Sequence, residues 1–94
     1  MTTKADIVWD IALQLGVEPP RMSTGSTEPR AIFDLINDTL GLGLAARLTK
    51  PEIARHIVEA SGQSWNADYE SHGGTVTKRG LLAVREAVQH FVGT

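Results

Sequence analysis

Apolar residues recur three or four positions apart in four separate segments of the chain, which is the pattern of amphipathic helices. The first segment predicts a helix over residues 4–15, ended by Gly16. The second predicts a helix that starts near Thr27 and stops at Gly41 and Gly43. The apolar positions of these two helices are Ile7, Ile11 and Leu15, then Ile32, Phe33, Ile36 and Leu40.

The second half of the chain shows a clearer helix start. Thr49 and Glu52 stand at the spacing of a capping box, which predicts a helix that runs to Gly62. A last helix begins near Thr77 and continues to about residue 92. The inward positions of these two helices are Ile53, Ile57 and Ala60, then Leu81, Val84, Val88 and Phe91.

The loop inside each half differs in character. A pair of prolines at 19–20 excludes a helix in the first loop and favours extended backbone before the second helix. The other loop, residues 63–75, carries Trp65 and Tyr69, which predicts that it packs on the core instead of reaching into solvent. Residues 74–77 are expected to form a short extended segment before the fourth helix.

The two halves are related in sequence. The run TKADI at 3–7 corresponds to TKPEI at 49–53, and the loop STGST at 23–27 corresponds to SHGGT at 71–75. The repeat predicts two tandem helix-loop-helix units, residues 3–43 and 48–93. Because neither unit can bury a useful core alone, we expect one compact, mainly α, four-helix domain over residues 1–94.

Composition and charge narrow the class of protein. The chain has no cysteine, which excludes disulfides and thiolate metal sites and agrees with a cytoplasmic protein. No segment reaches the roughly 18 apolar residues of a membrane-spanning helix, so we expect no membrane contact. The net charge of -2 is uneven, because residues 1–43 carry three basic and six acidic side chains while residues 44–94 carry six basic and five acidic. The second unit is therefore the better candidate for a polyanion.

The duplicated glycine loop is the first candidate site. Its pattern, Ser-x-Gly-[Ser/Gly]-Thr, places hydroxyl groups and unpaired amides at a helix start, where the helix dipole favours an anion such as phosphate. Arg30 follows the first copy, and Lys78 and Arg79 follow the second. The alternative is purely structural: a threonine caps the helix and the glycine makes the turn.

Basic side chains on the predicted helices form a second candidate surface. In helix-turn-helix proteins the start of the second helix enters the major groove, so the fourth helix would be the reading helix here, although its loop is longer than in that motif. Solvated surface charge is the alternative explanation for each basic residue. The full candidate set for nucleic-acid binding is Ser26, Thr27, Arg30, Lys50, Arg55, Ser71, His72, Gly73, Gly74, Thr75, Thr77, Lys78, Arg79 and Arg85.

Other chemistry is not indicated by the sequence. His56, His72 and His90 lie far apart without a ligand-spaced pair, which argues against a zinc site. The chain contains no nucleophile motif, phosphate-binding P-loop or dinucleotide fingerprint. We therefore expect no cofactor, no metal site and no catalytic activity.

The second unit resembles small helical accessory DNA-recognition domains appended to restriction endonucleases. The resemblance spans residues 48–92 and rests on Lys50-Pro51-Glu52-Ile53, Trp65, Gly73, Thr75 to Thr77 and Gly80-Leu81. It implies a DNA-recognition role in restriction-modification, with the nuclease elsewhere in a longer protein or in a partner. The first unit departs from the pattern, since it has Glu28-Pro29 where the second has Val76-Thr77.

Two functions follow from these observations. The first is a non-catalytic module that binds double-stranded DNA through its phosphate backbone, accessory to a restriction or defence nuclease. The second is a protein-interaction adaptor, or a small phage or defence-system inhibitor, that acts through the acidic first unit. The net charge of -2 favours the adaptor, whereas the duplicated loop favours DNA.

Overall fold

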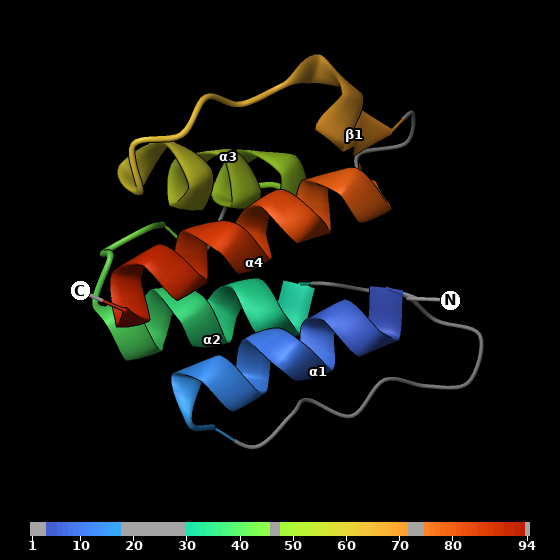
Figure 1. Cartoon of the computed structure of the whole chain (residues 1–94). Coiled ribbons are helices and arrows are strands. Elements are labelled where there is room, and N and C mark those ends of the chain that lie inside the picture. The colour runs from blue at the N-terminus through green and yellow to red at the C-terminus, as the bar shows by residue number, and fades with distance from the viewer. Residues whose placement is uncertain (1–3, 18–29, 46–47, 72–74, 94) are drawn as a thin grey trace.

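The computed structural model describes residues 4–17, 30–45, 48–71 and 75–93 (Figure 1). These residues form a mainly α, four-helix fold, as predicted. Its elements are α1 (Lys4–Leu15), α2 (Arg30–Leu40), α3 (Lys50–Ala60), the short 3-10 helix η1 (Ala67–Tyr69), β1 (Glu70–Ser71), β2 (Thr75–Val76) and α4 (Lys78–Val92).

The predicted helix limits agree closely with the structure. The first helix is described over residues 4–15. Gly16 follows α1 with a φ angle of 72°, and Gly62 lies just beyond α3 with a φ angle of 90°. Glycine adopts this left-handed backbone without the steric cost that other residues meet, so both residues suit a helix stop. The predicted start of the second helix near Thr27 lies outside the described residues, and α2 is described from Arg30 onward.

One hydrophobic core joins the four helices. It contains most of the predicted apolar positions, together with Val8, Ala12, Ala54, Val58, Val76, Ala83 and Ala87. Leu15, Leu40 and Phe91 are only half-buried at its edge. The expectation for Ala60 is wrong: it is exposed, because Ala54 and Val58 share the inner face of α3 with Ile53 and Ile57.

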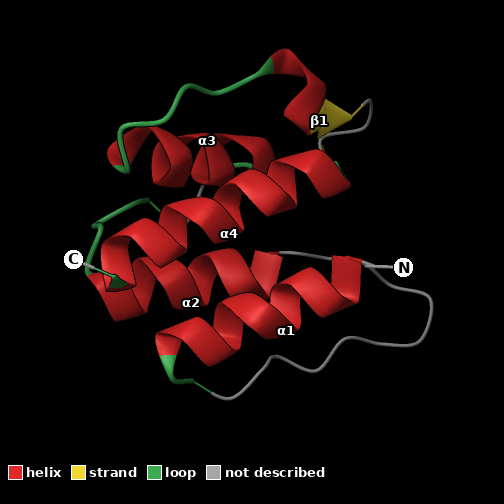
Figure 2. Cartoon of the chain, in the orientation of Figure 1, coloured by secondary structure: helices red, strands yellow, loops and turns green. Residues whose placement is uncertain are grey.

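The four helices run in the same direction through the molecule. In Figure 1 each begins on the right, near the N label, and ends on the left, near the C label. Helices of 11 to 15 residues are about 16–22 Å long. Because they all point the same way, the chain has to return across the molecule between one helix and the next. Figure 2 shows this return between α3 and α4, where a long loop crosses back before η1. The amino-terminal ends of all four helices consequently lie at one end of the fold.

The loop between α3 and α4 packs on the body of the protein, as its aromatic residues predicted. Trp65 and Tyr69 contact the core as an edge-to-face pair with ring centroids 5.1 Å apart, and the Trp65 indole nitrogen donates to a Glu70 carboxylate oxygen at 3.0 Å. The expected extended segment is β2, which pairs antiparallel with β1 in the register Glu70–Val76. This hairpin leads directly into α4.

The start of α3 is a complete capping box. The Glu52 amide donates to the Thr49 hydroxyl at 3.4 Å, and the Thr49 amide donates to the Glu52 carboxylate at 3.3 Å. The Thr49 hydroxyl also donates to that carboxylate at 2.8 Å. This hydrogen bond, followed by the one from the Thr49 amide, lowers the pKa of Glu52 below its ordinary value.

Replacing Thr49 by alanine is expected to lower the free energy of unfolding by about 1 kcal/mol at neutral pH, the usual cost of losing a threonine cap. Because the pKa of Glu52 is lowered in the folded state, its stabilising contribution is present above the unfolded pKa and is lost as pH falls through the folded pKa. Urea unfolding at pH 7 and at about pH 3 should therefore show a smaller acid-induced loss in T49A than in wild type. Ser64→Ala, which removes an exposed loop hydroxyl, is the matched control.

Candidate nucleic-acid interface

Both helices whose start is described begin on a basic residue. Lys50 begins α3 after the Thr49 cap, and Lys78 begins α4 after the Thr77 cap, with Arg79 beside it. Because the helices run in the same direction, the starts of α3 and α4 lie at one end of the molecule, and the fold places these three residues there (Figure 1). We call this surface the amino end.

Basic residues are unusual at helix starts. The aligned peptide dipoles place a partial charge of about +0.5 at each helix amino terminus, so a cation there costs stability. α4, whose start is described, has no acidic residue in its first turn to offset this charge. At the opposite ends the last turns of the helices contain no lysine or arginine, while Asp38 and Glu59 lie there. At the starts of α3 and α4 the positive ends of the helix dipoles therefore coincide with the basic side chains.

Four acidic residues also lie near the amino end and offset its basic side chains: Asp6, Glu52, Asp68 and Glu70. Glu52 is engaged in the cap of α3. An Asp68 carboxylate oxygen lies 3.5 Å from an Arg79 guanidinium nitrogen, but both side chains are more than two-thirds exposed, so water weakens this pair. Lys78 is half-buried and has no ion pair with any residue that the structure describes.

Thr77 caps α4 and ties it to the preceding loop. Its hydroxyl accepts from the Gly80 amide at 3.3 Å and donates to the Asp68 carbonyl at 3.0 Å. Its amide donates to the Tyr69 carbonyl at 2.9 Å. The hydroxyl proton is therefore already used within the chain, so the amides of Lys78 and Arg79, which have no partner inside a helix, are the donors that face outward here.

Two predicted site residues lie away from the amino end. Arg55, in the second turn of α3, pairs with Glu59 one turn later at 3.3 Å. Arg85, midway along α4, pairs with Asp10 of α1 at 3.2 Å and so joins two helices. The structure brings together Lys50, Thr77, Lys78 and Arg79, but it does not place Arg55 or Arg85 with them.

Several predicted residues cannot be compared with the structure. Ser26, Thr27, His72, Gly73 and Gly74 lie outside the described residues. The backbone of Arg30, Ser71 and Thr75 is placed in α2, β1 and β2, but their side chains fall outside what is described. The contribution of the two glycine loops stays a prediction.

Sequence reasoning selected Lys50 and Lys78 for their charge and not for a shared place at helix starts. That placement acquires meaning only when α3 and α4 are known to run in the same direction. Asp10 was missed, since its partner Arg85 is 75 residues away in sequence.

Comparison with known proteins gives no relative. No family model, curated protein or solved structure matches this chain. Within the described part of the chain, none of the helices has the length and apolar character needed to cross a bilayer. The same residues hold no cluster of three or more side chains suited to bind a metal ion.

Proposed function

We propose that this chain is a non-catalytic DNA-binding module whose amino end holds the phosphate backbone of a duplex. The observation that carries the proposal is the placement of Lys50, Lys78 and Arg79 at the amino termini of α3 and α4, which share one end of the molecule. Helix starts favour anions through their free amides and their dipole. Lysine and arginine at those positions favour phosphate further, at a cost to helix stability that a purely structural role would not require.

The contacts follow from the geometry of α4. A phosphate at its start would accept from the amides of Lys78 and Arg79 and from both side chains. The Arg79–Asp68 pair is exposed, so Arg79 can exchange Asp68 for a phosphate at little cost. Lys50 at the start of α3 would meet a neighbouring phosphate.

The resemblance of the second unit to accessory domains of restriction endonucleases supports a place beside a nuclease. In this proposal the chain contributes affinity and orientation, and a separate nuclease domain or partner protein contributes the chemistry. No catalytic step is assigned to residues of this chain.

Titration of a fluorescently labelled duplex tests the proposal. If two or three phosphates are neutralised, the logarithm of the association constant should fall with the logarithm of salt concentration with a slope of about -2 to -3. Binding should be clear at about 50 mM salt and weak at about 200 mM. No binding at the lower salt, or binding that salt does not change, would contradict the proposal.

A second candidate function, a protein-interaction adaptor, is favoured by one observation on α1. Trp9 and Leu13 lie one turn apart with 57% and 61% of their surface exposed, next to the exposed acidic residues Asp6 and Asp10. Large apolar side chains in such positions are typical of protein contact sites. Amide chemical shifts separate the two functions: added duplex should shift residues 77–80 if the chain binds DNA and should leave the spectrum unchanged if it is only an adaptor.

A further inference from the structure

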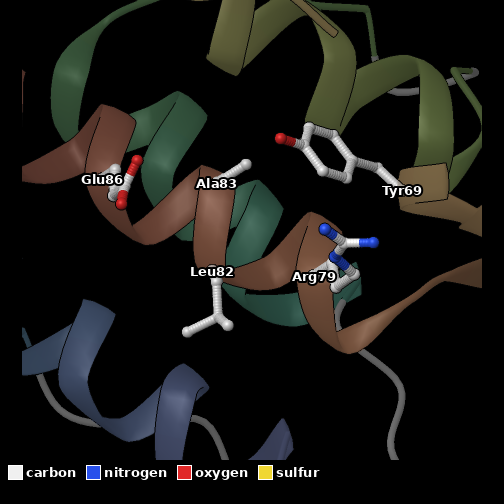
Figure 3. A pocket seen from close by; sticks show the side chains of 5 residues that line it. All are labelled: Tyr69, Arg79, Leu82, Ala83 and Glu86. Atoms are coloured by element: carbon white, nitrogen blue, oxygen red, sulfur yellow. The ribbon is translucent and has the colours of Figure 1, made fainter. Parts of the chain in front are cut away.

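A small pocket lies on the outer side of α4, next to the amino end. Its volume is about 180 Å³, and it is lined by Tyr69, Arg79, Leu82, Ala83 and Glu86. The four residues from α4 are spaced to share one face of the helix, and Tyr69 reaches over them from η1. Figure 3 shows the Tyr69 ring above the Arg79 guanidinium, with Ala83 and Glu86 farther along the helix.

The lining combines three kinds of chemistry. The Tyr69 ring provides a flat, apolar surface on which a ring can stack, and the largely buried Ala83 methyl lies at the base of the pocket. Arg79 at one end donates hydrogen bonds, and the exposed Glu86 carboxylate at the other accepts them. The volume is well below the roughly 300 Å³ at which pockets begin to hold drug-sized ligands, so the occupant is a single small ring system.

Position relates the pocket to the DNA surface. Arg79 belongs both to the pocket and to the start of α4, so a strand whose phosphate lies at the amides of Lys78 and Arg79 has its base next to Tyr69. A base pair is too large to enter, whereas a base outside the stack can. Glutamate in such sites accepts from an exocyclic amino group, as on cytosine.

We propose that this pocket holds one unpaired nucleobase bearing an exocyclic amino group, in a DNA strand whose phosphates lie at the amino end. The inference rests on the proposed function, because the phosphate contacts are what bring the base to the pocket. Tyr69 stacks on the base, Glu86 accepts from its amino group, and Arg79 donates to its carbonyl oxygen. The module thereby prefers sites where a base has left the duplex.

Three duplexes of the same sequence test the inference: one fully paired, one with a single bulged cytosine, and one with an abasic nucleotide in place of that cytosine. The two bulged duplexes have the same phosphates and similar flexibility, so only the base differs. The wild-type protein should bind the cytosine bulge at least about fivefold more tightly than the abasic bulge, the lower limit for one stacked base.

Two variants locate the effect in the pocket. Tyr69→Leu removes the stacking ring but keeps an apolar side chain against the core, and Glu86→Ala removes the carboxylate from an exposed position where the fold tolerates the change. Each should reduce the preference for the cytosine bulge while the paired duplex is bound at least as tightly as by wild type. Equal binding of both bulges, or a preference that survives both substitutions, would overturn the inference and leave the proposed function intact. Failure to bind any of the three duplexes would instead remove the proposed function, and the inference with it.

Discussion

Gly80→Ala is expected to destabilise the fold by at least about 1 kcal/mol, although alanine favours helices over glycine. A Cβ atom at Gly80 would lie 2.5 Å from Val76 Cγ1 and 2.7 Å from the Tyr69 carbonyl oxygen. Val76 is fully buried, and the Tyr69 carbonyl accepts from the Thr77 amide, so neither can move freely. Overpacking costs about 1–3 kcal/mol, and contacts this short belong at the upper end of that range, so a gain of about 1 kcal/mol in helix propensity leaves a net loss of about 1–2 kcal/mol.

Thermal unfolding measures this loss directly, since a domain of this size loses about 4–8 °C of melting temperature for each kcal/mol. Gln89→Ala, on the exposed side of the same helix, should leave the melting temperature nearly unchanged. A double-mutant cycle identifies the clash: Val76→Ala should cost less in the G80A protein than in wild type, because it removes the atom that the new Cβ meets. A G80A protein as stable as wild type would show that η1 and β2 are not packed closely on α4.

The helices and their ends could be predicted because their signals are local. Threonine caps at 49 and 77 precede α3 and α4, and glycines follow α1 and α3, so each boundary depends on residues within one or two turns. Apolar spacing then identified the buried face of each helix. The prediction for Ala60 failed because a small residue at the edge of an apolar stripe gives the same sequence pattern whether its side chain faces the core or solvent.

The candidate site could be predicted only in part, because it depends on the arrangement of whole helices. The glycine loop drew attention to Lys78 and Arg79, and the structure places Lys50 at the same end. The ion pairs of Arg55 and Arg85 were not foreseen, so these residues were grouped with the site on charge alone. The direction of a helix in the fold is set by long-range packing, which a repeat in the sequence does not specify.

Lys78→Gln is expected to weaken DNA binding while leaving the fold at least as stable as before. One lost phosphate contact should make the slope of log association constant against log salt less negative by about 0.9, and K78Q/R79Q should change it by roughly twice as much. Stability should not fall, because Lys78 stands at the positive end of the α4 dipole and has no ion pair among the described residues. Salt-dependent titration and urea unfolding of the same samples measure both effects.

Arg55→Gln is the matched control for this prediction. It removes one positive charge from an exposed helix position, as Lys78→Gln removes one from α4, but Arg55 lies a turn beyond the amino end and pairs with Glu59. If DNA responded only to the total charge of the protein, the two variants would change the salt slope equally. If the helix starts hold the phosphates, only Lys78→Gln changes it. Equal slopes would therefore contradict the amino end as the interface, whereas a loss confined to Lys78→Gln, without loss of stability, would show that this cation serves binding and not the fold.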